Sequence, residues 1–298
     1  MTIQNYEYTH SQAEFDEMCE LLVYSYTVST KPFNWRLAQA ENWNHASRYL
    51  EPLEYFTSRV HLWRDGAGAL VGFLIRYYDT TYLQVHPGHR YVEARMLEWA
   101  ESNWAGAKAR ISTTAYDHDT QRQRLLAQRG YKDLGVSEHV RIYDLAKTYP
   151  EAVLPPGFRI ATLAELGDAA GRIALENSIW SANLDAAWLK GKQSAPHYAL
   201  DWDLVVLAPG GQQVAASLVW IDPRNGSAEI DPLGTHPDYR RRGLARAIIT
   251  ESFRRMQARG LRYAYITANA ANHVVNHLYA SFQPVETYYG HDWVKRLD

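Results

Sequence analysis

The chain has 298 residues, of which 46% are hydrophobic, and a formal net charge of -2 at pH 7. This length allows two ordinary domains, each with its own hydrophobic core. The nearly balanced charge argues against a general nucleic-acid binder. Cys19 is the only cysteine, which excludes an internal disulfide framework and a cysteine-rich metal site, and we expect no bound metal.

The sequence contains no apolar run long enough to span a bilayer, and residues 1–5 lack the basic and apolar regions of a signal peptide. We therefore expect a cytoplasmic protein that contacts neither membrane nor nucleic acid. The sequence leaves open whether it is a monomer or a homodimer.

The expected elements run in the same coarse order in both halves of the chain. In the first half we expect a strand at 6–8, an amphipathic helix at 15–25, an aromatic-rich helical or irregular region up to residue 59, and strands at 60–64 and 69–78. In the second half we expect a strand at 158–160, a helix at 163–180, strands at 204–208, 214–221 and 227–235, a helix at 244–259, a strand at 263–268, a helix at 271–280 and a strand at 288–295. This order predicts a mixed α/β fold, because helices are followed by an antiparallel meander and then by a strand–helix–strand unit.

A repeat of domain length supports this reading. Residues 83–90 align with residues 233–240 at an offset of 150 residues, with a leucine, a His-Pro pair and an arginine matching. The same offset brings Glu101-Ser102 onto Glu251-Ser252. Such order predicts two copies of one fold, each a mostly antiparallel sheet flanked by helices.

The predicted boundary between the copies lies beside the segment Leu154-Pro155-Pro156-Gly157, because adjacent prolines interrupt regular structure. We assign residues 1–150 to an N-terminal domain and residues 151–298 to a C-terminal domain.

The stretch from Arg240 to Ala245 lies between a predicted strand and a predicted helix. A glycine in such a turn, here Gly243, adopts conformations closed to other residues, and the helix start offers unpaired N–H groups that suit a phosphate. The pattern Arg-x-x-Gly-x-Ala, preceded by a strand and His-Pro, resembles the acetyl-CoA pyrophosphate loop of the GCN5-related N-acetyltransferases, the GNAT family. The resemblance implies the order of elements given above and acetyl-CoA as the cofactor.

In the resembled family the strand before the loop is splayed from its neighbour, and its N–H groups bind the pantetheine arm and the thioester carbonyl. A later helix with its Asn also approaches the cofactor. The cofactor-binding residues implied for this sequence are Leu233, Gly234, Thr235, Arg240, Arg241, Arg242, Gly243, Leu244, Ala245 and Asn272.

The resemblance also points to catalytic residues. Tyr279 lies in a segment similar to the family's late motif, where a tyrosine hydroxyl faces the thioester sulfur and serves as general acid. Glu229 is the candidate general base, since several family members place a carboxylate on this strand. Alternation along a regular strand would put Glu229, Asp231 and Leu233 on one face, so Asp231 or a water chain remains open as the base.

The two copies differ at the loop. Glu93 stands where the second copy has Gly243, and Leu126 stands opposite Tyr279. A carboxylate there would face a pyrophosphate, and like charges about 4 Å apart cost on the order of one to several kcal/mol. We therefore predict that residues 1–150 form a degenerate copy, and that residues 151–298 bind acetyl-CoA.

The function that we expect is transfer of an acetyl group from acetyl-CoA to a primary amine of a small molecule by direct attack. The sequence does not identify the acceptor. Two alternatives stay open: a CoA-binding or regulatory module without catalysis, and acetylation of a protein or peptide amine.

Overall fold

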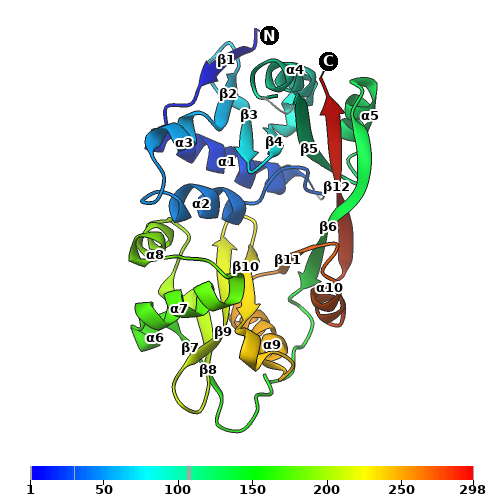
Figure 1. Cartoon of the computed structure of the whole chain (residues 1–298). Helices are drawn as coiled ribbons and strands as arrows, with labels where there is room; N and C mark the ends of the chain where they lie inside the picture. The colour runs from blue at the N-terminus through cyan, green and yellow to red at the C-terminus, as the bar shows by residue number, and fades with distance from the viewer. Residues whose placement is uncertain (1, 30, 106–108, 298) are drawn as a thin grey trace.

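The computed structural model describes residues 2–29, 31–105 and 109–297 of the chain (Figure 1). Within these residues the strands form one twelve-stranded sheet in the order β1-β2-β3-β4-β5-β12-β6-β11-β10-β9-β8-β7. The strands are β1 (Gln4–Glu7), β2 (Val60–Arg64), β3 (Leu70–Tyr77), β4 (Thr80–Val85), β5 (Arg110–Tyr116), β6 (Lys132–Asp144), β7 (Arg159–Thr162), β8 (Asp203–Leu207), β9 (Gln213–Asp222), β10 (Ser227–Thr235), β11 (Tyr263–Asn269) and β12 (Glu286–Arg296). The pairs β4–β5 and β10–β11 are parallel, and the other pairs are antiparallel.

Helices cover both faces of this sheet, which confirms the predicted mixed α/β fold. The α-helices are α1 (Gln12–Val28), α2 (Leu37–Ala46), α3 (Leu53–Thr57), α4 (Glu93–Asn103), α5 (Thr120–Gln128), α6 (Leu163–Leu166), α7 (Ala169–Trp180), α8 (Ala186–Gln193), α9 (Leu244–Ala258) and α10 (His273–Ala280). Short 3-10 helices are η1 (Pro87–Val92), η3 (Leu200–Trp202) and η4 (Pro237–Tyr239).

One predicted helix, at 163–180, is broken in two. Gly167 takes a left-handed conformation (φ 60°) and ends α6, as glycine does at many helix C-termini. The Asp168 side chain then accepts a hydrogen bond from the Gly171 N–H and caps the start of α7. The prediction of one continuous helix is therefore wrong at this point.

The last strand of each half lies within the other half of the sheet. β12 lies between β5 and β6, and β6 pairs with β11 on its other edge, so the two long strands run side by side at the junction (Figure 1). Trp293 of β12 packs into the core around α4, and Tyr143 of β6 packs into the core around α9. The sheet and the cores thus continue across the predicted boundary at residue 150.

The two faces of the sheet carry different helices at the second half. Ile248 and Phe253 of α9 pack on one face, whereas Leu175 of α7 packs on the other. Helix α2 of the first half lies on the same face as α7, where Ala38 packs with Trp220 of β9. The first half therefore covers part of the second half's sheet.

Candidate functional site

A cleft of about 720 Å³ lies beside the N-terminus of α9, and we call it the α9 cleft. It lies at the Leu233–Thr235 end of β10, between the first turn of α9 and the length of α10. The predicted residues that line it are Leu233, Gly234, Thr235, Arg240, Arg241, Gly243, Leu244, Ala245, Asn272 and Tyr279.

The turn before α9 has the backbone geometry that the sequence predicts. Gly243 is the N-cap residue with φ 81°, in the left-handed region, and no side chain caps the helix. The first N–H groups of a 15-residue helix therefore face the cleft together with the positive end of the helix dipole. Arg240 and Arg241 add exposed guanidinium groups to this end of the cleft.

Arg242 does not line the α9 cleft. Its guanidinium donates to the backbone oxygen of Asp238 over 3.1 Å and stacks 4.9 Å from the centre of the Tyr239 ring. Arg246 lines the cleft instead and donates to the hydroxyl of Ser281 over 2.8 Å. The sequence analysis did not predict Arg246 as a site residue, although its position in the first turn of the predicted helix indicates that it lies close to the glycine turn.

The strands β10 and β11 diverge beside this cleft. They pair only at Ser227–Glu229 of β10, and from Leu233 to Thr235 β10 pairs with β9 alone. The hydroxyl of Thr235 is buried without a hydrogen-bond partner in the described residues. The open edge of β10 thus leaves polar groups available to a ligand with amide and carbonyl groups of its own.

A β-bulge separates the two ends of β10. Its register with β9 shifts by one residue between Ile230 and Leu233. Because one extra residue reverses the alternation of side chains, Leu233 faces α9 whereas Glu229 and Asp231 face α2. The prediction that these three residues share one face is wrong, since it assumed a regular strand.

Tyr279 projects from α10 and is only 4% exposed. Burial raises the pKa of its hydroxyl well above the ordinary value, and the carboxylate of Asp231 raises it further. The phenol therefore holds its proton at neutral pH. On the same helix Asn272 lines the cleft while its side chain accepts from the Val275 N–H over 3.2 Å, so that it is also the N-cap of α10.

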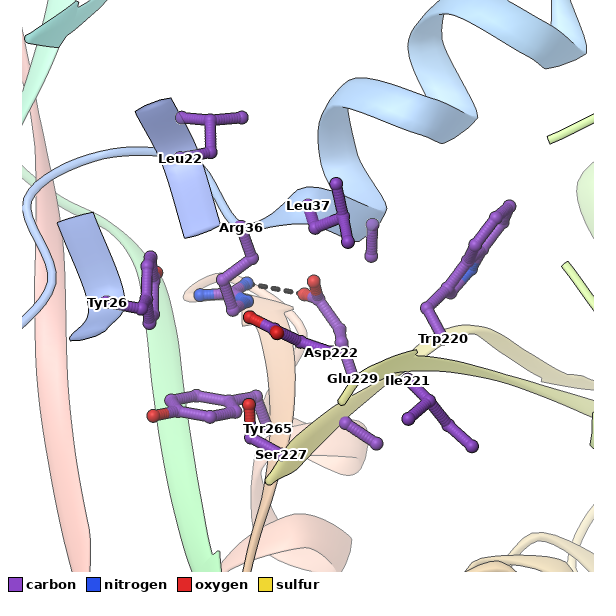
Figure 2. Close-up of a pocket in the computed structure, with 12 residues that line it drawn as sticks. Leu22, Tyr26, Arg36, Leu37, Trp220, Ile221, Asp222, Ser227, Glu229 and Tyr265 are labelled. Atoms are coloured by element: carbon purple, nitrogen blue, oxygen red, sulfur yellow. Dashed lines mark hydrogen bonds and ion pairs between the residues drawn. The ribbon is translucent and has the colours of Figure 1, made fainter. Parts of the chain in front are cut away.

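Glu229 is held in an ion pair between the two halves. Figure 2 shows Arg36, at the start of α2, pointing toward the Glu229 carboxylate, with an N–O separation of 2.5 Å. Both side chains are 5% exposed, and Arg36 also donates to the Thr267 hydroxyl over 2.7 Å. The cavity around them has about 20 Å³, which is room for about one water molecule rather than a ligand.

Asp231 lies two residues further along the strand and has no ion-pair partner in the part of the chain that the structure describes. Burial, followed by the negative charge of Glu229, raises the pKa of Asp231 to about 6. Its backbone oxygen accepts a hydrogen bond of 2.6 Å from the Trp220 indole, which fixes the bulge against β9. Its side chain lines a cavity of about 290 Å³ between the halves, which we call the junction chamber.

The first half differs at the position of the glycine turn. Glu93 begins α4, where an offset of 150 residues places Gly243 in the second half. Its carboxylate is fully buried and accepts from Arg90 over 2.6 Å and from Arg122 over 3.2 Å. Arg90 and Arg122 are thus already paired with the Glu93 carboxylate of the protein itself.

The edge of β4 is also occupied. Val85 corresponds to Thr235 at the same offset, and its N–H donates to the Asn34 side chain over 3.1 Å. The Asn34 amide nitrogen donates back to the Val85 oxygen over 2.8 Å. This side chain therefore takes both backbone groups of Val85, whereas in the second half the Thr235 oxygen accepts from the Arg240 side chain over 3.2 Å.

Within the described ranges no group of three or more His, Cys, Asp or Glu residues could hold a metal ion. No described helix has the length and apolar character needed to cross a membrane.

Comparison with known proteins identifies the class of this fold and site. Residues 175–283 match the model of the acetyltransferase (GNAT) family. The matched segment contains β10, the glycine turn, α9 and Tyr279, so this part of the chain belongs to that family of acyltransferases. Comparison with curated protein sequences gives no match.

Three solved structures share the fold over almost the whole chain. A tandem GNAT protein from the clavulanic acid biosynthesis pathway has 14% identity and a TM-score of 0.63, with 99% of this chain and 98% of that chain covered. A GCN5-related N-acetyltransferase from Sphaerobacter thermophilus has 19% identity and a TM-score of 0.62 over 97% and 95% of the two chains. A GNAT-family acetyltransferase from Colwellia psychrerythraea has 11% identity and a TM-score of 0.62 over 99% and 100%.

Proposed function

We propose that this chain transfers an acetyl group from acetyl-CoA to a primary amine of a small molecule. The observation that carries the proposal is the bulge of β10. It places Leu233 in the α9 cleft on one face of the sheet, and Asp231 in the junction chamber on the other. A donor in the first cavity and an acceptor in the second would meet at this bulge.

The α9 cleft suits acetyl-CoA. The uncapped start of α9 and the guanidinium groups of Arg240, Arg241 and Arg246 are complementary to a pyrophosphate. The unpaired edge of β10 at Leu233–Thr235 matches the amides of a pantetheine arm. The thioester would supply the activated acetyl group.

The first half does not bind acetyl-CoA in this proposal. The buried carboxylate of Glu93 replaces the glycine turn, and Asn34 covers the edge of β4. A pyrophosphate at this turn would meet a negative charge, and a pantetheine arm would have to displace two hydrogen bonds. We therefore propose one acetyl-CoA per chain.

Asp231 is the base that we favour over Glu229. The Glu229 carboxylate is occupied by Arg36, whereas Asp231 lines the chamber with a pKa near 6. A primary amine has a pKa of about 10, so each unit by which the base's pKa rises toward it reduces the cost of proton transfer by about 1.4 kcal/mol. Relative to an ordinary aspartate, Asp231 reduces that cost by about 3 kcal/mol.

The reaction balances with two proton transfers. The amine nitrogen attacks the thioester carbonyl carbon and forms the N–C bond, and its proton passes to Asp231. The C–S bond breaks, and the departing thiolate takes the proton of the Tyr279 hydroxyl. Solvent then removes the proton from Asp231 and returns one to Tyr279.

The junction chamber favours a small acceptor over a protein chain. Its volume of about 290 Å³ is at the lower end of small-molecule pockets, and α2 of the first half covers it from one side. A lysine at the end of a protein would have to enter past this helix.

An assay of acetyl-CoA with a panel of amines, read as thiol release, tests the proposal. We expect turnover with small primary amines and loss of turnover in the Asp231→Asn variant. Faster acetylation of a lysine-containing peptide would replace the small-molecule acceptor by a protein acceptor. Tight acetyl-CoA binding without turnover of any amine would identify a module that binds CoA without catalysis.

A further inference from the structure

The junction chamber contains two carboxylates, Asp231 from the second half and Glu138 from β6. Neither forms an ion pair within the described part of the chain. Burial raises the pKa of Glu138, and the charge of Arg36 and the Tyr116 hydroxyl offset this only in part. Arg36 is paired with Glu229 and Arg122 with Glu93. Lys192 and Arg36 lower the pKa of Asp231 through their charges, without an ion pair to it among the described residues. A positively charged ligand would therefore be the direct ion-pair partner of the chamber carboxylates.

The chamber also presents hydrogen-bond donors that a simple amine would leave unsatisfied. The side-chain oxygens of Gln39 and Gln84 accept backbone N–H groups over 2.9 and 2.6 Å, whereas their amide nitrogens have no partner among the described residues. By contrast, both polar atoms of Asn34 are satisfied.

This inventory separates two classes of amine. A protonated diamine only donates hydrogen bonds, so it would satisfy the carboxylates and leave the amide donors of Gln39 and Gln84 unpaired. A hydroxyl group both donates and accepts, so an amine that carries several hydroxyls would satisfy the carboxylates and the amides together.

One wall of the chamber is aromatic. The ring of Trp35 lies 4.8 Å from that of Tyr82 and 6.3 Å from that of Tyr77, centre to centre. Such a wall suits the C–H face of a saturated ring as well as an ammonium group. Because Trp35, Tyr77 and Tyr82 all belong to the first half, the degenerate copy contributes most of this surface.

From these contacts we propose that the acceptor is a small polyhydroxylated primary amine of the amino-sugar or amino-cyclitol type. Its amine lies beside Asp231, its hydroxyls are bound by Glu138, Gln39 and Gln84, and its ring lies against the aromatic wall. This inference rests on the proposed acetyl transfer and specifies the substrate class of that same site.

The test compares three hydroxylated amines, D-glucosamine, D-galactosamine and 2-deoxystreptamine, with cyclohexylamine and 1,4-diaminobutane. Thiol release from acetyl-CoA measures kcat and KM for each. We expect kcat/KM for the best hydroxylated amine to exceed that of cyclohexylamine by at least about 100-fold, since sites built to bind hydroxyls reject analogues that lack them. Equal or faster turnover of cyclohexylamine or 1,4-diaminobutane would overturn the inference while leaving acetyl transfer intact.

Two variants locate the binding surface. Glu138→Gln should raise KM for the hydroxylated amine about tenfold with little change in kcat. Gln39→Glu keeps the acceptor of the Arg36 N–H and removes the amide donor, so it should raise KM for the hydroxylated amine but not for cyclohexylamine. Glu7→Gln, an exposed carboxylate on β1, is the matched control and should change neither constant. A KM that is unchanged in both chamber variants contradicts the inference.

A binding measurement separates this inference from the proposed reaction. Calorimetry of the intact chain without acetyl-CoA should detect the hydroxylated amine and should detect cyclohexylamine weakly or not at all. If no amine is turned over, the proposed function fails, and this titration still decides the chemistry of the chamber. Equal affinity for both ligands would then reject the hydroxylated class.

Discussion

Replacement of Asp231 by Asn tests the assignment of the base. In the folded chain this carboxyl has a pKa near 6, so about one-tenth is ionised at pH 5 and about nine-tenths at pH 7. Only the ionised form accepts a proton, so the catalysed rate should fall about tenfold from pH 7 to pH 5. General bases contribute about 10²–10⁴-fold to rate, and the Asn variant should lose a factor in this range.

The assay measures kcat/KM by thiol release between pH 5 and 9 for both proteins. The acceptor amine also titrates, but the ratio of wild-type to variant rates cancels its contribution. That ratio should rise with pH below 6 and level off above it. A ratio that stays constant across this range would refute Asp231 as the base. Glu229→Gln would then be examined with the same profile.

Three further outcomes are expected. Tyr279→Phe should lower kcat about 100-fold and leave the affinity for acetyl-CoA unchanged in calorimetry; unchanged turnover would remove its role as acid. Wild type should bind one acetyl-CoA per chain. Gly243→Val should weaken this binding at least tenfold, because a branched side chain resists the left-handed conformation of Gly243. Gly210→Val, at a glycine outside that conformation, should leave the binding unchanged. The hydrogen bond to Glu41 raises the pKa of His197, so the stabilisation that this pair gives is complete below about pH 6.5 and is lost as pH rises through the raised pKa. The difference in Tm between wild type and His197→Ala should therefore be larger at pH 6 than at pH 9. An equal difference at both pH values would contradict this role of the pair.

The elements that the sequence predicted well are those whose signals are local. The strand before the loop, the left-handed glycine and the long helix after it follow from periodicity and from one residue with special backbone freedom, and the structure places Gly243 and α9 as expected. Tyr279 of α10 and its N-cap residue Asn272 lie in one recognisable sequence motif, and both line the α9 cleft.

The features that the sequence did not reveal depend on contacts between distant segments. The Arg36–Glu229 ion pair joins residues 193 positions apart, and no pattern near either residue announces it. The bulge of β10 follows from a register with β9 that alternation cannot show, and it moved Leu233 to the opposite face. The exchange of β6 and β12 between halves is equally invisible, because pairing between segments far apart in the chain leaves no local sequence pattern.

The two roles of the first half are linked through one segment. Asn34 covers the edge of β4, Trp35 forms part of the chamber wall, and Arg36 binds Glu229 of the other half. If Asn34 moved to open the first half for a pantetheine arm, the two residues that follow it would be displaced from the junction. The same segment thus covers the edge of β4 and lines the junction chamber, so a chain that bound acetyl-CoA in both halves would lack the junction chamber of this one.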